Sequence, residues 1–112
     1  SIQPVNKNKR SVLVECHKID TVVESGKILS PDVVKIDIEG HELSVLKGGE
    51  KLFSSANKPK SLLMEIHPVY LSQFYKSSFE EIWNLITEKY GYAPVVVMSH
   101  HPNRFMCYFK ST

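Results

Sequence analysis

The chain alternates between short hydrophobic runs and longer polar segments, a pattern that predicts buried strands joined by helices and turns. The segment 33–38 (Val-Val-Lys-Ile-Asp-Ile) is rich in β-branched residues and nearly continuous in hydrophobicity. Such runs are typical of parallel strands that are covered on both faces. The predicted strands are 12–16, 33–38, 62–67, 95–98 and 105–109.

Helical spacing of hydrophobic residues predicts a helix over 41–53, directly after the second strand. Gly48 and Gly49 interrupt this pattern, and they indicate either a close packing contact or an early end of the helix. The segment 19–23 has two interpretations. It either continues the first strand or begins a short helix with Asp20 as its N-cap.

A second predicted helix, 79–90, has a signal at each end. Ser78 and Glu81 have the S-x-x-E form of a capping box, and Gly91 is the expected C-terminal cap. The alternation of strand and helix implies an α/β fold with a parallel sheet and right-handed crossovers. The last two strands are joined by only about six residues, too few for a parallel crossover. They are therefore expected to form a terminal antiparallel β-hairpin.

Length and charge narrow the class of protein. With 112 residues the chain is expected to be one domain at most, with 1–11 as a polar lead-in to the folded part, 12–112. The net charge of +2 is too small to argue for a nucleic-acid partner, and no apolar run approaches the ~20 residues that cross a membrane. Cys16 and Cys107 lie in predicted strands. Buried thiols in a reducing cytoplasm are the simplest interpretation, and a disulfide between them stays open.

Acidic groups and a histidine gather at the ends of two consecutive strands. Asp37 and Glu39 end the strand 33–38, and Glu65 and His67 end the next one. In open α/β sheets, ligands bind just outside the carboxyl ends of parallel strands. Side chains alternate along a strand, so each pair shares one face, and adjacent strands would bring all four groups to one rim. These four residues are the predicted catalytic residues.

Each of these groups also has a structural explanation. Lys35 and Asp37 could form an ion pair, Glu39 could favour the N-terminus of the following helix, and His67 could simply end its strand. If the rim is catalytic, His67 is the best candidate for a general base, because imidazole ordinarily titrates near neutrality.

Three other histidines, His41, His100 and His101, are most simply explained as solvated surface residues, and for His100 and His101 a role in acceptor choice is the alternative. Glu42 falls in the first turn of the predicted helix, where it could either favour the helix dipole or be catalytic.

The same residue types would also suit a metal ion. Their spacing, however, matches neither the HExxH helix nor the twelve-residue calcium loop. Placing Gly40 at the sixth position of such a loop would put Lys35 at its first position, where a cation ligand is required. The sequence therefore predicts no metal site.

Three segments resemble the FkbM-type methyltransferases, and together they span most of residues 12–110. The segment 35–42 (Lys-Ile-Asp-Ile-Glu-Gly-His-Glu) is similar to the family's KIDxEGxE signature, and Leu-Lys-Gly follows at 46–48. Supporting matches are 64–68 (Met-Glu-Ile-His-Pro) and 19–23 (Ile-Asp-Thr-Val-Val). The resemblance implies S-adenosylmethionine (SAM) as cofactor and O-methylation of a hydroxyl on a sugar or other small metabolite. It implies that Asp37 faces the SAM crevice.

The resemblance also implies the C-terminal half of a Rossmann-like class I methyltransferase sheet, in which the last strand inserts between two earlier ones. The family's SAM-binding half comes earlier and carries a glycine-rich turn, and none of the five glycines here forms such a run. We therefore expect a missing N-terminal half, or self-association through an exposed sheet edge, and little activity of this chain alone. Two other interpretations stay open, a non-catalytic pairing or scaffold module and a different α/β cofactor enzyme such as a nucleotide binder.

Overall fold

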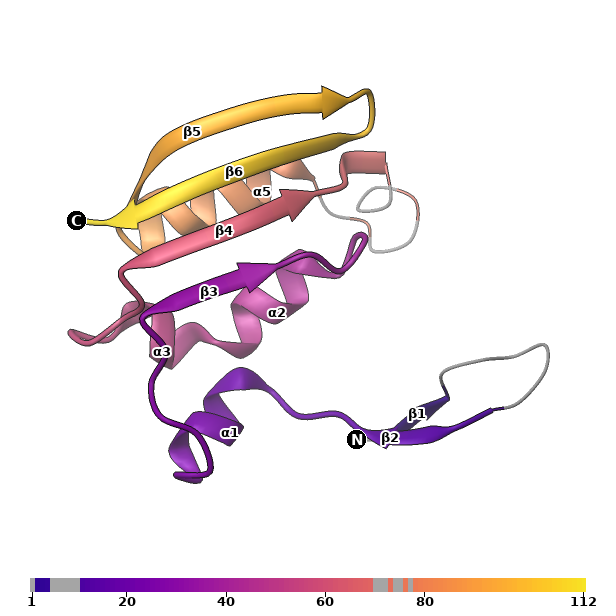
Figure 1. Ribbon diagram of the computed structural model, residues 1–112, viewed down its shortest axis with the longest axis vertical. Coiled ribbons are helices and arrows are strands. Elements are labelled where there is room, and N and C mark those ends of the chain that lie inside the picture. Colours follow the sequence, from indigo (N-terminus) through magenta and orange to yellow (C-terminus); the bar gives the residue numbers. More distant parts are fainter. Residues whose placement is uncertain (1, 5–10, 70–72, 74–75, 77) are drawn as a thin grey trace.

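A computed structural model of the chain describes residues 2–4, 11–69, 73, 76 and 78–112. Its centre is a four-stranded mixed sheet with the strand order β3-β4-β6-β5 (Figure 1). The strands are β3 (Val33–Ile36), β4 (Ser61–Ile66), β5 (Tyr92–His101) and β6 (Arg104–Ser111). β3 and β4 are parallel, whereas β6 runs antiparallel to both β4 and β5. The predicted terminal hairpin is confirmed, and its second strand lies between two earlier ones.

Short helices connect these strands. They are α1 (Ile19–Glu24), α2 (Glu42–Gly48), α3 (Glu50–Ser54), α5 (Phe79–Asn84) and the π-helical turn η1 (Leu85–Lys89). The N-cap half of the predicted capping box is confirmed, because the Ser78 hydroxyl accepts a hydrogen bond from the Glu81 N–H at 3.2 Å. Gly91 follows the helical turns with φ of 73°, a left-handed conformation that glycine adopts without strain. The predicted helix 79–90 is therefore confirmed in extent, although its second half is π-helical.

The single helix predicted over 41–53 is instead two helices that meet at Gly49. A Cβ atom at Gly49 would lie 2.6 Å from Cε2 of Phe53, closer than real Cβ contacts come. The Phe53 ring therefore packs directly on the glycine backbone. Both interpretations of the glycine pair hold, since the close contact and the end of the first helix occur at the same residue.

The segment 19–23 is helical, which decides between its two interpretations. The prediction that Asp20 is the N-cap is wrong, because Lys18 occupies that position. The Asp20 carboxylate instead accepts hydrogen bonds from the backbone N–H of Lys51 at 2.8 Å and of Leu52 at 3.0 Å. It therefore caps the start of α3, a helix about 30 residues later in the chain.

The helices cover one face of the sheet. Alternate residues of β4 and β6 point to this face and pack against α2, α3, α5 and η1 in a single core. The buried core residues are Ile36, Leu46, Phe53, Leu62, Met64, Ile66, Ile82, Ile86, Tyr90, Tyr92, Cys107 and Phe109. This core fixes β3 and β4 side by side, which determines where their carboxyl ends lie.

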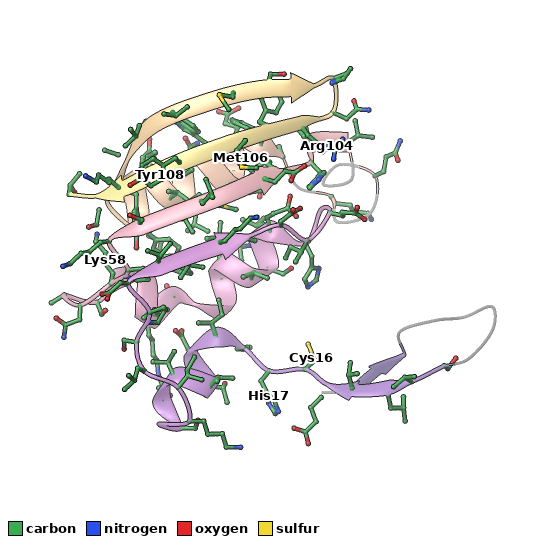
Figure 2. All side chains as sticks on the ribbon, in the orientation of Figure 1. Cys16, His17, Lys58, Arg104, Met106 and Tyr108 are labelled. Atoms are coloured by element: carbon green, nitrogen blue, oxygen red, sulfur yellow. The ribbon has the colours of Figure 1, made fainter. Side chains whose placement is uncertain are left out.

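The opposite face of the sheet carries no helix in the described part of the chain (Figure 1). This face is partly apolar. The labelled Met106 and Tyr108 lie on β6, and the strand register places them beside Met98 and Val96 of β5 (Figure 2). Val96 is 45% exposed and Met98 53% exposed. Val33 of β3 is 65% exposed. The prediction that 33–38 is covered on both faces is therefore wrong for this chain.

A second, two-stranded sheet consists of β1 (Ile2–Pro4) and β2 (Leu13–Glu15), which pair antiparallel away from the main sheet (Figure 1). Leu13 is 71% exposed, so the predicted strand 12–16 exists but is not buried. Cys16 is exposed, contrary to expectation, whereas Cys107 is buried as expected, and both are thiols rather than halves of a disulfide. Within the described residues, no helix is long and apolar enough to cross a membrane.

Candidate functional site

The carboxyl ends of β3 and β4 lie next to each other at one rim of the sheet. The two strands pair in parallel with Ile36 opposite Met64, so Asp37 directly follows one strand while Glu65 and His67 lie at the end of the other. One carboxylate oxygen from Asp37, one from Glu65 and a ring nitrogen of His67 all lie within 4.8 Å of one another. Glu65 and His67 are buried, and Asp37 is exposed. The predicted convergence is confirmed for these three residues, which we call the rim triad.

Glu39, the fourth predicted site residue, is not part of this triad. It lies in the turn after β3 with φ of 49°, and its side chain is exposed. His41 is the N-cap of α2, and no side chain forms a capping hydrogen bond there. No ion pair joins Lys35 to Asp37 among the described residues. The structural explanations offered for Asp37 and Glu39 are therefore not supported by a contact.

Glu42, for which the sequence left a helix-dipole role and a catalytic role open, contacts the rim triad through His67. Its side chain is fully buried. The carboxylate oxygen Oε1 accepts a hydrogen bond from the His67 backbone N–H at 3.1 Å and lies 3.3 Å from Nδ1 of the same residue. The other oxygen, Oε2, accepts a hydrogen bond from the Gly40 N–H. The only signal for this role was that the family-like segment 35–42 ends on this glutamate.

His67 lies between two carboxylates. Its Nε2 is 3.4 Å from Oε1 of Glu65, and its Nδ1 faces Glu42. Because a carboxylate only accepts hydrogen bonds, Nδ1 is assigned a hydrogen, and a proton or another cation on Nε2 would face Glu65. A positive charge bound at Nε2 would be stabilised by both neighbours. The geometry therefore suits proton uptake or cation binding at this nitrogen.

Arg104 completes the rim from the first residue of β6. Its Nη1 lies 3.3 Å from Oε1 of Glu65, and its side chain is 43% exposed (Figure 2). No signal in the sequence pointed to this contact, because it depends on β6 pairing with β4, and the two partners are 39 positions apart in the chain. The guanidinium provides one positive charge beside the buried carboxylate.

The sequence contains three other histidines that were candidates for this end of the sheet. His41 is exposed at the start of α2. The backbone of His100 and His101 forms the last part of β5, but their side chains lie outside the described residues. A role for the last two in acceptor choice therefore stays a prediction.

Residues 3–94 match the family described as "Methyltransferase FkbM domain". The chain belongs to the FkbM methyltransferase family. A segment of 48 residues is 50% identical to the hexuronic acid methyltransferase AglP of Haloferax volcanii. This segment is 43% of the FkbM chain and 19% of AglP, so the match spans about a fifth of that relative. No solved structure gives a significant match.

Proposed function

We propose that this FkbM chain is the C-terminal half of a Rossmann-like, SAM-dependent methyltransferase domain. The longer protein would transfer a methyl group to a hydroxyl oxygen of a sugar or another small metabolite. Family membership supports the methyltransferase class, and the relative named for hexuronic acid supports a sugar acceptor. The observation that carries the proposal is the rim triad at the carboxyl ends of two parallel strands.

Methyl transfer from SAM is an in-line displacement, so the domain must align the acceptor oxygen with the methyl carbon. The sulfonium carries a positive charge, which a nearby carboxylate stabilises in a cleft that excludes water. Asp37 is the exposed acid of the rim triad, and we assign it to the side of the crevice that receives SAM. Glu39, in the adjacent turn, is assigned to the acceptor side.

His67 is the proposed general base. As the acceptor oxygen forms its bond to the methyl carbon and the carbon–sulfur bond breaks, the hydroxyl proton passes to Nε2 of His67. The resulting imidazolium lies between Glu42 and Glu65, which stabilise its charge. Glu42 positions the ring, because it holds both the backbone N–H and Nδ1 of the same histidine.

The uncovered face of the main sheet is the proposed docking surface for the missing N-terminal half. Parallel strands are normally buried on both faces, whereas the partly apolar side of β3 and β4 opposite the helices is open here. β3 is also an edge strand, with one side unpaired among the described residues. Without the other half, self-association through the same surfaces is the expected alternative. We place the whole protein in the cytoplasm, in keeping with the exposed Cys16 thiol.

Calorimetric titration with SAM tests this assignment on two chains, the 112-residue chain and one extended towards its N-terminus. We expect no measurable binding by the short chain and binding of one SAM by the extended chain. Binding by the short chain would contradict the view that half of the pocket is absent. If the extended chain does not bind SAM, the methyltransferase assignment fails and a non-catalytic scaffold module is favoured.

The base is tested in the extended chain with His67→Gln. General acid–base catalysis typically contributes ~10²–10⁴-fold, so we expect kcat to fall by about a hundredfold or more while SAM binding is retained. His17→Gln is the matched control, because His17 is an exposed histidine away from the rim. A rate for His67→Gln within a few-fold of the parent would exclude His67 as the base.

A further inference from the structure

We infer that Asp37, Glu65 and His67 bind one divalent metal cation. The binding itself follows from the donor set of the rim triad, and only its use in catalysis rests on the proposed function. The sequence analysis predicted no metal site, because metal motifs are defined by spacing along one segment. Here the donors come from two strands that the fold brings together.

The spacing of the donors fits an ion. Nε2 of His67 and Oε1 of Glu65 are 3.4 Å apart. Two ligands of a tetrahedral Zn²⁺, each at about 2.1 Å, lie roughly 3.4 Å from each other. The Asp37 carboxylate is within 4.8 Å of both atoms and is exposed beyond the end of β3. A change of its side-chain rotamer would bring it closer to the other two donors.

The orientation of His67 is a second, independent observation. A histidine that ligates a metal almost always donates its other ring N–H to a carboxylate or carbonyl, which fixes the tautomer and the ring plane. Glu42 is such a partner. Its fully buried carboxylate lies on the Nδ1 side of the ring, and it is not a member of the rim triad. Nε2 consequently faces the carboxylate oxygen of Glu65, and a proton or a metal cation bound at this nitrogen would lie between the two acceptor atoms.

The charges around the site are compatible with a bound cation. Glu42 and Glu65 are buried acids, Asp37 is a third carboxylate, and Arg104 provides a positive charge beside Glu65. Arg104 contacts the same Oε1 of Glu65 from a side chain that is 43% exposed, so its guanidinium would have to move aside when the ion binds. One imidazole with two carboxylates favours Zn²⁺ or Mn²⁺ over Mg²⁺ or Ca²⁺, which prefer oxygen ligands alone.

In the proposed methyl transfer, the bound cation would coordinate the acceptor hydroxyl and lower its pKa. The hydroxyl proton then leaves to water, while the oxygen forms its bond to the methyl carbon and the carbon–sulfur bond breaks. Nε2 of His67 is occupied by the metal in this route. His67 would therefore act as a ligand rather than as the base, and the two roles can be separated by experiment.

Calorimetric titration of the chelator-treated chain with Zn²⁺, and separately with Mn²⁺, tests the site. We expect one ion per chain, with affinity at least tenfold weaker in Asp37→Asn and in His67→Gln. Glu42→Gln should weaken binding by ~10–100-fold, as loss of a group that orients a ligand does. Asp32→Asn is the matched control, because Asp32 is an exposed aspartate at the opposite end of β3, and its affinity should stay within about twofold.

Circular dichroism checks that each variant folds. If His67→Gln does not fold, Asp37→Asn still decides the question, because Asp37 is exposed. The inference is overturned if the parent chain binds neither ion, or if folded Asp37→Asn binds as tightly as the parent. It is supported if binding is lost in the triad variants and kept in the control.

The failure of this inference can be distinguished from the failure of the proposed function. In one outcome, the chain binds no metal and the extended chain transfers methyl groups at an unchanged rate in excess chelator. This outcome would exclude the metal site and leave a methyltransferase with His67 as its base. In the other outcome, the short chain binds metal and the extended chain does not bind SAM. This outcome would support the metal site and exclude the methyltransferase assignment.

Discussion

The carboxylate of Glu42 lies 3.3 Å from Nδ1 of His67, although the two residues are 25 positions apart in the chain. Both side chains are almost fully buried, with 0% and 6% exposed. The contact joins the first turn of α2 to the end of β4, and it orients the imidazole towards the other members of the rim triad. A buried ion-pair partner of this kind is both a stability determinant and a positioning residue.

Replacing Glu42 by Ala should lower the free energy of unfolding by about 3 kcal/mol. The backbone N–H groups of Gly40 and His67 lose their acceptor, and each buried unsatisfied donor costs ~1–3 kcal/mol. Urea denaturation measures the change. Glu39→Gln, at an exposed glutamate in the preceding turn, should change it by less than about 0.5 kcal/mol. Equal effects of the two substitutions would contradict the assigned role of Glu42.

The two adjacent glycines should respond to alanine in opposite directions. In Gly49→Ala the new Cβ would lie 2.6 Å from the Phe53 ring, and such overpacking typically costs ~1–3 kcal/mol. In Gly48→Ala the nearest atom is Cβ of Lys18 at 3.5 Å, an ordinary contact, so higher helix propensity should stabilise by up to ~1 kcal/mol. Thermal unfolding of both variants measures the difference. A stable Gly49→Ala protein would show that the ring does not pack on the glycine.

Alkaline pH should destabilise the fold through two buried tyrosines. Burial raises the pKa of both Tyr90 and Tyr92 to about 12, from the ordinary value of 10. The folded chain then holds protons that the unfolded chain releases. This contribution is fully present below about pH 10 and is lost as pH rises towards 12. Urea titrations between pH 9 and 12 measure the fall. Tyr92→Phe should reduce the loss of unfolding free energy with rising pH, and the control Tyr108→Phe should not. If the pH dependence is the same in Tyr92→Phe as in the parent, buried Tyr92 is not its cause.

The two thiols should differ in reactivity. Burial raises the pKa of Cys107 to about 11, which suppresses its thiolate, whereas Cys16 is exposed. With a disulfide reagent that absorbs on cleavage, we expect one thiol per chain to react at once and the second only after denaturation. Cys16→Ser should remove the fast phase, and Cys107→Ser should retain it. A fast phase in Cys16→Ser would mean that Cys107 is accessible.

Several elements were predictable because their signals are local. The cap formed by Ser78 acts within a single helical turn. The connection of about six residues between the predicted strands 95–98 and 105–109 is too short for a parallel crossover and leaves only a hairpin. Strand–helix alternation suggested that β3 and β4 are neighbours, and on that condition four groups were predicted to converge. The prediction holds for Asp37, Glu65 and His67 and not for Glu39. Their catalytic roles stay predictions.

Other features had no local signal. The run 12–16 has a strand-like composition, yet its exposure depends on whether another element covers it. Glu42 and Arg104 are each an ordinary charged residue in the sequence, and both reach the rim only through packing and strand pairing over long separations. The cation site depends on the same pairing.

The sequence by itself determined the periodic elements, the order in which they occur and the family signature, because hydrophobic period, capping and turn chemistry act between residues a few positions apart. The tertiary structure alone decided which face of the sheet is covered, that Asp20 caps α3, and that Glu42 holds His67. These features depend on distances between segments, which are set only when the strands pair and the helices pack on one side of them.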